Sequence, residues 1–502
     1  MTLNLTSDQI NAYNRLVKFI KNNDEHELLL IGNAGTGKTT LIAKFINDMI
    51  KNKKCKKISI ASPTHKALGI VKSKLFENAT EDIIKKVEIT TIHSLLLYNS
   101  YVNDKGIKYF AMGKNKPNFS KYNIVIIDEC SMLSNQIIND INTQKMVTKL
   151  LYVGDMGQLP PVCQQDSEIF KKNIEIIKLE EIVRTKNNII QEISQSHRLW
   201  IFDLTKMPNL SKYICEDIRA EMYKNKNLWL DKFVNIIKST GKMNADNCII
   251  LTWTNKRCDE YNKYIREKLF NKTNLQQYEV NEILIMDDHH KIKDVSFYSS
   301  EKIKIVSVSE IEIKFMKFKE INTTDETVLP SKIIKLIVSF IDNVNKLLEN
   351  KLNVYSLNVN KLTDILNNVI DAPIHNICVM KSHDKYDEIQ KKFYETIQNL
   401  QYETHKIISK LKLDDNEKTN CFAEINKKIN AFWKKWNENV VDKIANVNYA
   451  YVITTHKSQG SSFQNIFIDV DDILSNTNKK ESLKCLYTAI TRAILTIDFL
   501  LP

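Results

Sequence analysis

The sequence has little glycine, no paired cysteine motifs and no long apolar run. Its nine cysteines form no CxxC pair and no CxxC…CxxC or CxxC…HxxxH array, which argues against a structural zinc site. Their odd number and their place in apolar runs indicate reduced thiols in an intracellular protein. No apolar run approaches the roughly 20 residues that span a bilayer, and the N-terminus does not resemble a signal peptide. We therefore expect a protein that is neither secreted nor embedded in a membrane.

The chain is long and carries an excess of positive charge. Its 502 residues are too many for one ordinary core, so we expect two to four domains. The 72 Lys and Arg against 60 Asp and Glu give a formal net charge of +12. Such an excess suits a polyanionic partner, for example nucleic acid. The alternative cause of this excess is the abundance of Lys, Asn and Ile that an AT-rich genome produces. The same composition and the compact length point to a virus or phage, and a viral protein of this kind would be expected in the nucleus or cytoplasm of its host.

Short apolar runs recur through the first 185 residues, and each ends in a polar or glycine-rich turn. They occupy residues 27–31, 57–61, 124–127 and 150–153, and helical patterns such as 39–51 lie between them. This alternation predicts a parallel α/β sheet. Ligands bind such sheets at the carboxyl ends of the strands, where the motifs described below are found.

The remaining pattern predicts a second α/β unit and two insertions. Residues 94–121 are basic and aromatic without helical period, and we expect a hairpin that turns at 103–106. Alternation early in 271–447 predicts a small β-barrel, and helical period from about 331 to 446 predicts a helical segment. The expected division is a first domain at 1–93 and 122–185, a pin-like insertion at 94–121, a second domain at 186–270 and 448–502, and an insertion at 271–447. Strands at 247–252, 448–454 and 465–470 and a helix at 480–493 are expected in the second domain.

Residues 32–39, GNAGTGKT, fit the phosphate-binding pattern G-x-x-x-x-G-K-[ST] between an expected strand and an expected helix. Glycine lets the backbone close around phosphate oxygens where a Cβ would collide, and amide N–H groups then face the anion. Lys38 would bridge the β- and γ-phosphates and the Thr39 hydroxyl would bind Mg²⁺. The sequence therefore predicts binding of ATP with Mg²⁺.

The next motif follows the apolar run at 124–127 and reads DECSM. Asp128 would hold Mg²⁺, and Glu129 would activate the attacking water. A buried strand that ends in solvated acids is the alternative reading of these two residues taken alone.

Another strand ends in VGDMGQLPPV, where Gln158 is a candidate sensor of the γ-phosphate. Six of the ten glycines (32, 35, 37, 154, 157 and 460) fall in the proposed motifs.

Arg184 and Arg492 are candidates to neutralise charge in the transition state, since a guanidinium fork suits phosphate oxygens. A surface ion pair is the alternative for each arginine.

The ordered set of motifs resembles superfamily 1 helicases, specifically the 5′-to-3′ branch of RecD-, Dda- and Pif-type enzymes. The matching stretches are LTSDQINAYN, GNAGTGKTT, ASPTHKAL, TTIHSLL, VIIDECSML, GDMGQLPPV, LEEIVRT, LTWTNKRCDEYN, TTHKSQGSSF and LYTAITRA. The last two are closer to the RecD/Dda group. The resemblance covers about residues 1–265 and 448–502 and implies two RecA-like parallel-sheet domains.

The resemblance also implies residue roles. Gln9 would read adenine, and Arg184 and Arg492 would be the arginine fingers. The nucleotide would be held by Gln9, Gly32, Asn33, Ala34, Gly35, Thr36, Gly37, Lys38, Thr39, Thr40 and Gly460. The single strand would pass along Pro63, Thr64, His65, His93, Trp253, Thr254, Asn255, Thr455, His456, Lys457 and Ser458. Hydroxyls, amides and a lysine suit a sugar–phosphate backbone read without base specificity.

Several of these residues have a second reading. Trp253 would stack on a base, or it is a core tryptophan at a strand end. His93 and His456 line the DNA path or are buried histidines with local partners. Tyr98, Tyr101 and Phe110 are candidate wedges of a strand-separating pin, or they hold the hairpin to its own domain. The basic run 51–57 is a solvated helix end or a phosphate contact.

The resemblance thus implies an ATP-hydrolysing DNA helicase that moves 5′-to-3′ on single-stranded DNA in replication, repair or recombination. Its cofactors would be ATP and Mg²⁺. Its partners would be single-stranded DNA and duplex junctions, with replication or single-strand-binding proteins, and we expect a monomer without a fused nuclease. An RNA helicase and a non-catalytic binding module of the same fold are the alternatives.

Overall fold

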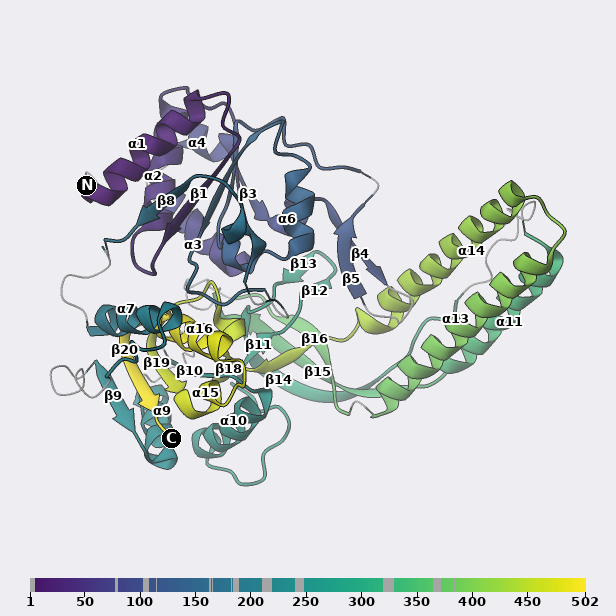
Figure 1. Cartoon of the computed structure of the whole chain (residues 1–502). Helices are drawn as coiled ribbons and strands as arrows, with labels where there is room; N and C mark the ends of the chain where they lie inside the picture. The colour runs from purple at the N-terminus through teal and green to yellow at the C-terminus, as the bar shows by residue number, and fades with distance from the viewer. Residues whose placement is uncertain are drawn as a thin grey trace. The chain divides into compact units, whose positions relative to one another are not determined.

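The computed structural model describes residues 5–76, 80–102, 108–113, 115–161, 164, 166–181, 183, 189–209, 219–239, 248–318, 329–363, 372–382 and 384–502. The chain divides into two compact units. The first consists of Met1–Tyr98, Met112–Leu275 and Tyr449–Pro502, and the second of Asn99–Ala111 and Gln276–Asn448. Two parallel sheets lie in the first unit, whereas the second contains an antiparallel sheet and three long helices (Figure 1).

The first sheet has six strands in the order β3-β2-β6-β7-β1-β8, and all neighbouring pairs are parallel. Its strands are β1 (Glu27–Gly32), β2 (Ile58–Ser62), β3 (Val87–Thr91), β6 (Ile124–Ile127), β7 (Lys149–Gly154) and β8 (Ile176–Leu179). The four predicted apolar runs are β1, β2, β6 and β7. These strands are buried along nearly their whole length, as a parallel sheet covered on both faces requires.

Helices cover both faces of this sheet, so the first domain has three layers. One face carries α1 (Ser7–Lys21), α2 (Lys38–Lys51), α3 (His65–Phe76) and α4 (Glu81–Lys86). The other face carries α5 (Ile92–Leu95), α6 (Asn135–Asn142) and the short turns η1 (Cys130–Met132) and η2 (Glu168–Lys171).

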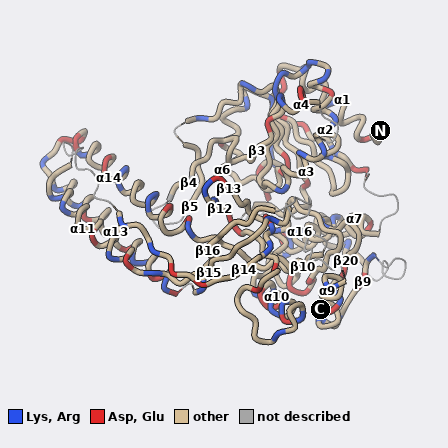
Figure 2. The backbone as a smooth tube through the Cα atoms, turned by 180° about the vertical axis from the view of Figure 1, so that it is seen from behind, with Lys and Arg blue, Asp and Glu red and all other residues tan. Residues whose placement is uncertain are grey.

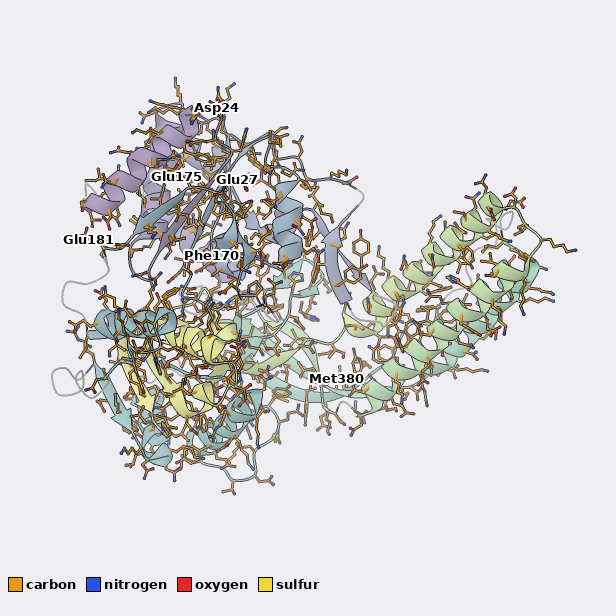
Figure 3. The ribbon with its side chains drawn as sticks, viewed as in Figure 1. Asp24, Glu27, Phe170, Glu175, Glu181 and Met380 are labelled. Atoms are coloured by element: carbon orange, nitrogen blue, oxygen red, sulfur yellow. The ribbon has the colours of Figure 1, made fainter. Side chains whose placement is uncertain are left out.

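Ion pairs gather near the start of β1 and β8. Arg15 of α1 contacts Glu25 at 2.7 Å and Glu175 at 2.6 Å, and Lys172 pairs with Glu27. Figure 3 labels Glu27 and Glu175 beside these two neighbouring strands. The pairs tie α1 to this end of the sheet and leave the carboxyl ends of the strands for the functional motifs.

The second sheet has five parallel strands in the order β18-β10-β19-β20-β9. Its strands are β9 (Ala220–Tyr223), β10 (Cys248–Thr252), β18 (Val452–Thr454), β19 (Phe463–Asp469) and β20 (Ala493–Leu500). Segments from both sides of the large insertion therefore form one sheet. Two parallel α/β domains confirm the predicted fold class.

The helices of this domain are α7 (Ile189–Phe202), α9 (Lys226–Ser239), α10 (Asn255–Phe270), α15 (Val470–Leu474) and α16 (Lys479–Ile490), with the turn η5 (Thr455–Ser458). Helices α9 and α10 pack their apolar residues against β10 and β19. In α16, every residue from 482 to 490 is buried. This helix, predicted at 480–493, is thus enclosed on all sides.

The second unit contains a five-stranded sheet in the order β16-β15-β14-β11-β17 and a separate β12-β13 hairpin. Its strands are β11 (Ile283–Met286), β12 (His290–Ile292), β13 (Val295–Phe297), β14 (Lys302–Ile313), β15 (Leu352–Lys361), β16 (His375–Met380) and β17 (Val447–Tyr449). The pairs from β11 through β14 and β15 to β16 are antiparallel.

Three long helices complete this unit: α11 (Ser331–Leu348), α13 (Asp384–Lys410) and α14 (Asp415–Trp436), followed by the single π-helical turn η4 (Asn437–Val441). They share one apolar core in which the rings of Phe393 and Trp436 stack with centroids 3.9 Å apart. Asp414 and Glu417 form a capping box that starts α14.

The expected order of a barrel followed by a helical segment is wrong in its second half. Strands β15 and β16 lie within residues 331–446, where we expected only helix, and they extend the sheet that β14 begins. The expected strand at 448–454 is two strands, β17 and β18, which belong to different sheets.

Charge is distributed unevenly along the chain. Residues 276–448 hold 25 Lys and Arg against 26 Asp and Glu, so the whole positive excess of the chain resides in the remainder. Figure 2 shows the two signs intermixed along α11, α13 and α14. The electrostatic attraction for a polyanion therefore comes from outside this segment.

Candidate nucleotide site and nucleic-acid path

The phosphate loop connects β1 to α2, as the sequence predicts. Gly35 (φ +86°) and Gly37 (φ +76°) have left-handed backbone conformations that side chains disfavour. A Cβ on Gly37 would lie 2.5 Å from Gln9 Nε2, and one on Gly32 would lie 2.6 Å from Thr36 Oγ1. The loop thus depends on glycine for both its conformation and its packing.

Lys38 begins α2 and its ammonium group closes the loop. Its Nζ donates to the carbonyls of Gly32 at 2.7 Å and Asn33 at 3.0 Å. The next two residues, Thr39 and Thr40, lie in the first turn, where helical N–H groups favour anions. Lys74 of α3 donates to Thr40 Oγ1 at 2.9 Å.

Gln9 supports the loop from α1. Thr6 and Gln9 form a capping box, and the Gln9 amide Nε2 donates to the Thr36 carbonyl at 2.9 Å. Only 3% of this residue is exposed. Gln9 therefore holds the backbone of the phosphate loop in place.

Asp128 and Glu129 follow β6 directly. The Asp128 amide donates to the Ala61 carbonyl at 2.8 Å, and the Glu129 amide donates to Asp128 Oδ1 at 3.0 Å. Burial, together with the charge of Glu129, raises the pKa of Asp128 to about 7, and Lys38 acts in the opposite direction. A cation beside this carboxyl would favour its charged form.

A cavity of about 520 Å³ opens over the phosphate loop and is bounded by both α/β domains. Its lining comprises Gln9, Ala34, Gly35, Gly37, Lys38, Thr39, Thr40, Ala67, Ile70, Val71, Lys74, Asp128, Glu129, Gln158, Val183, Gly460, Ser461, Ser462, Thr491 and Arg492. The hydroxyl of Thr39 and the carboxylate of Asp128 supply the oxygen ligands that Mg²⁺ prefers. The donor set therefore fits a nucleotide with Mg²⁺.

Arg492 enters this cavity from the second domain. Its Nε donates to the Thr488 carbonyl at 3.1 Å, Nη1 to the Ser461 carbonyl at 3.2 Å and Nη2 to Thr491 Oγ1 at 3.0 Å. These bonds orient the guanidinium. The other candidate finger, Arg184, lies outside the described residues, although the Val183 amide before it donates to the Gly35 carbonyl at 3.0 Å.

Gly460 brings the second domain close to the first. Its φ is +72°, and a Cβ there would lie 2.9 Å from Thr64 Oγ1. Leu159 makes a further connection, because its amide donates to Thr488 Oγ1 at 3.1 Å and its carbonyl accepts from Gln459 at 3.1 Å. The motifs of the two domains are therefore in direct contact at this boundary.

The residues expected to line the path in the first domain lie at the end of β2 and near α5. Pro63 and Thr64 are half-buried, and His65 is exposed at the start of α3. His93 is half-buried with its ring 5.3 Å from that of Tyr98, and burial lowers its pKa. These residues share the carboxyl edge of the sheet.

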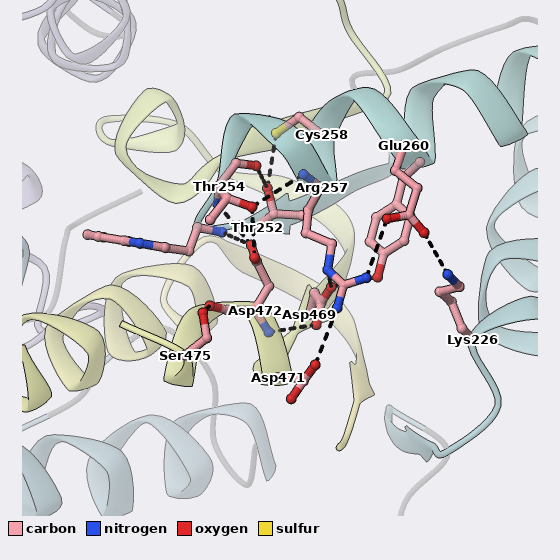
Figure 4. A network of polar contacts seen from close by, with 12 residues as sticks. Lys226, Thr252, Thr254, Arg257, Cys258, Glu260, Asp469, Asp471, Asp472 and Ser475 are labelled. Carbon is pink, nitrogen blue, oxygen red and sulfur yellow. Dashed lines mark hydrogen bonds and ion pairs between the residues drawn. The ribbon is translucent and has the colours of Figure 1, made fainter. Parts of the chain in front are cut away.

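In the second domain, Asp472 organises the turn after β10. Its carboxylate accepts from the amides of Trp253 at 2.7 Å and Thr254 at 2.8 Å, and from Thr254 Oγ1 at 2.8 Å. Thr254 also caps α10, which begins with the exposed Asn255. Figure 4 shows this network, in which Asp472 lies against Thr254. Sequence reasoning missed Asp472.

Trp253 and His456 form an aromatic pair, with ring centroids 5.1 Å apart and planes inclined by 54°. Both are half-buried, as is Lys457, and burial lowers the pKa of His456. The Trp253 ring therefore packs on a neighbouring motif rather than within the apolar core.

Two expected path residues have a different local role. Thr455 and Ser458 are fully buried. The Thr455 hydroxyl donates to the Thr252 carbonyl at 3.2 Å, and the Ser458 hydroxyl donates to the Thr455 carbonyl at 2.7 Å. Because buried hydroxyls need such partners, these two side chains shape the turn and present no surface to a strand.

The expected pin is a two-stranded hairpin of β4 (Tyr98–Val102) and β5 (Lys108–Met112); its expected turn at 103–106 lies outside the described residues. Tyr98 is an anchor and not a wedge, because its hydroxyl donates to Asp140 of α6 at 2.5 Å and its ring packs on the first domain. Tyr101 lies against Tyr109, with ring centroids 5.8 Å apart. Phe110 is 51% exposed.

Some classes of site are absent from the part of the chain that the structure describes. No group of three or more His, Cys, Asp or Glu is arranged to hold a metal ion there. Within the same ranges, no helix has the length and apolar character needed to cross a bilayer. Of the nine cysteines in the sequence, the seven that lie in the described ranges are free thiols.

Two family models match the chain. The AAA domain matches residues 18–164, and the UvrD-like helicase C-terminal domain matches residues 449–494. These stretches contain the phosphate loop and the two motifs that surround Gly460 and Arg492.

Two relatives can be aligned with nearly the whole length of the chain. Uncharacterized protein R530 of Acanthamoeba polyphaga mimivirus is 29% identical over 525 residues, which cover 99% of each sequence. The RecBCD enzyme subunit RecD of Buchnera aphidicola subsp. Schizaphis graminum is 29% identical over 494 residues and covers 93% of this chain and 68% of its own. A crystal structure of Pif1 helicase from Bacteroides in complex with ADP-AlF3 and ssDNA has 14% identity and a TM-score of 0.46, covering 100% and 95%.

The motif series, the two family models and the similarity to RecD agree with one another. The AAA model covers most of the first domain, the UvrD-like helicase C-terminal model covers part of the second, and RecD is similar to 93% of the chain. Together these findings support a superfamily 1B helicase of the RecD/Pif-like type, to which the chain is similar.

Proposed function

We propose that the protein hydrolyses ATP to move 5′-to-3′ along single-stranded DNA and to unwind duplex DNA. The observation that carries this proposal is the cavity between the two α/β domains. Lys38, Asp128 and Glu129 line it from the first domain, and Arg492 lines it from the second. A site assembled from both domains suits a motor in which nucleotide state controls the cleft between them.

Each lining residue has a chemical role in this proposal. Lys38 neutralises phosphate charge, and Glu129 accepts the proton of the attacking water. Gln158 orients that water. Arg492 stabilises the charge that develops in the transition state, held by its three hydrogen bonds in the second domain. Thr39 and Asp128 would hold Mg²⁺, which when bound neutralises the phosphate oxygens.

The nucleic-acid partner is proposed from the residues at the carboxyl edges of both sheets and from the relatives. The proposed path includes the exposed His65 and Asn255 and the Trp253–His456 pair. The similar Bacteroides structure is described as a complex with ssDNA. We propose DNA over RNA and 5′-to-3′ movement on the family resemblance, and we expect a monomer.

The test is unwinding of a duplex that carries a single-stranded tail on one side only. We expect ATP-dependent unwinding with a 5′ DNA tail, little with a 3′ tail, and weaker stimulation by an RNA tail of the same sequence. Lys38→Ala should reduce the ATPase rate at least about 100-fold. Better unwinding from a 3′ tail would overturn the polarity, and undiminished activity in Lys38→Ala would overturn the catalytic assignment.

A further inference from the structure

Tyr487 is a tyrosine whose hydroxyl is buried at the boundary between the two α/β domains. It belongs to α16 of the second domain and is fully buried. Its hydroxyl nevertheless contacts two groups of the first domain. Such a hydroxyl is costly to bury unless its donor and acceptor capacity is used.

Both capacities are used. The Tyr487 hydroxyl donates to Asp155 Oδ2 at 2.7 Å and accepts from the amide of Ala34 at 3.4 Å. Ala34 is the third residue of the phosphate loop, and it lines the nucleotide cavity. One side chain of the second domain therefore connects the phosphate loop to the turn that follows β7.

That turn carries Gln158. Asp155 is fully buried, and its Oδ1 accepts from the amide of Gly157 at 2.9 Å. A Cβ on Gly157 would lie 2.9 Å from the Tyr487 ring, so the ring rests directly on the turn. The Gln158 amide donates to the Asp155 carbonyl at 3.3 Å. The Asp155–Tyr487 contact thus helps to hold the turn that carries Gln158, together with Arg198 of α7, whose Nε lies 3.6 Å from Asp155 Oδ1.

The end of the same helix also binds the side chain of Arg492, which follows the helix in the chain. Thr488, next to Tyr487, accepts from the Leu159 amide at 3.1 Å through its hydroxyl and from Arg492 Nε at 3.1 Å through its carbonyl. The end of α16 therefore connects three parts of the cavity: the phosphate loop, the Gln158 turn and the candidate arginine finger.

Burial, followed by the charge of Asp155, raises the pKa of Tyr487 well above its ordinary value. The hydroxyl therefore stays protonated and remains a donor to Asp155 throughout the pH range in which the protein would work.

We propose that Tyr487 is a positioning residue that couples nucleotide binding to the grip on nucleic acid. This inference rests on the proposed function. A change in the conformation of the phosphate loop is transmitted through the Tyr487 hydroxyl to α16. From α16 the change is transmitted to Gly460 and to the turn with His456 and Lys457 in the second domain. Without the hydroxyl each domain keeps its own fold, but the two ligands influence one another less.

The experiment measures this coupling directly. A fluorescent oligo-dT is titrated with the full-length protein in the absence and presence of a non-hydrolysable ATP analogue with Mg²⁺. The ratio of the two Kd values is the coupling factor. Tyr487→Phe keeps the ring and removes the hydroxyl, and we expect its coupling factor to move about tenfold toward 1. Asp155→Asn should move it in the same direction.

The matched control is Tyr261→Phe. The Tyr261 hydroxyl is also buried and donates to a carboxylate, Asp469 Oδ2 at 2.6 Å, but both residues belong to the second domain. An unchanged factor in this control, with a reduced factor in Tyr487→Phe, supports the inference. An unchanged factor in Tyr487→Phe, or an equal reduction in both variants, overturns it. A wild-type protein without DNA-stimulated ATPase or nucleotide-dependent DNA binding would instead contradict the proposed function, and this inference with it.

Discussion

At the scale of single residues, the burial of His197 in α7 predicts how the stability of the protein depends on pH. Only 2% of it is exposed, and its Nδ1 donates to the Ile193 carbonyl at 2.7 Å. Its Nε2 is buried and has no hydrogen-bond partner among the described residues. Burial lowers the pKa of His197 from 6.5 to about 4. The native state therefore contains this histidine in its neutral form at pH 5, whereas the unfolded state protonates it.

A prediction about stability against pH follows. Between pH 6.5 and about 4 the native state binds fewer protons at His197 than the unfolded state, so stability falls as pH falls. This one residue should remove about 2 kcal/mol of unfolding free energy between pH 7 and pH 5. Urea unfolding of His197→Gln at the two pH values should show a correspondingly smaller difference.

His289→Gln is the control for this measurement, because His289 is exposed. Its pH dependence should equal that of the wild type. If the unfolding free energy of His197→Gln changes between pH 7 and pH 5 as much as that of the wild type, His197 is not the group that titrates.

Residue identities in the motifs were predictable from the sequence, but their orientations were not. The spacing around Lys38 and Asp128 predicts a nucleotide site because a phosphate loop is a local structure. Asp472 could not be found in this way, since it lies 218 residues from its partner Thr254. The burial of Thr455 and Ser458 likewise depends on packing that only the folded domain supplies.

At the scale of elements, the β4–β5 hairpin is the candidate strand-separating device. Tyr98 anchors its base to α6, which leaves Phe110 on β5 with 51% of its surface exposed. An exposed aromatic ring can stack on the terminal base pair of a duplex.

We predict that Phe110→Ala uncouples unwinding from ATP hydrolysis. Loss of one stacking contact should reduce the unwinding rate about tenfold, while ATPase activity stimulated by single-stranded DNA changes less than about twofold. Tyr402→Ala on α13, which removes an aromatic ring that is 64% exposed, is the matched control and should leave both rates unchanged. Equal loss of both activities in Phe110→Ala would argue against a pin.

The elements also show why the large insertion was predicted only in part. β15 alternates buried Leu352 and Val354 with the exposed Asn353, a strand pattern that is visible in the sequence. Its partner β14 is separated from it by α11, and strong helical periods flank both β15 and β16. A strand whose partner is distant gains stability only after the loop between them closes, so local patterns underestimate it.

At the scale of the whole molecule, charge is segregated between segments. The helical insertion is close to neutral, and the remainder carries the positive excess. Counterion release should therefore follow from lysines of the motif-bearing domains.

We predict the effect on the salt dependence of binding. Lys457→Gln should reduce the slope of log K against log salt for single-stranded DNA by about 0.7, as loss of one phosphate contact does. Lys434→Gln on α14, whose side chain is 77% exposed, should leave affinity and slope unchanged. A reduced slope in the α14 variant would show that the insertion also binds the strand.

The interrupted second sheet has a consequence for synthesis on the ribosome. In the described part of the chain, β9 and β10 pair only with β18, β19 and β20, all of which follow the insertion. At typical translation rates, the apolar strand β10 therefore waits on the order of 10–40 s for its first partner. During that time the first domain can already fold, whereas CIILT remains an unpaired, aggregation-prone segment. Production of the protein should accordingly depend on chaperones that shield nascent chains between the two halves of this sheet.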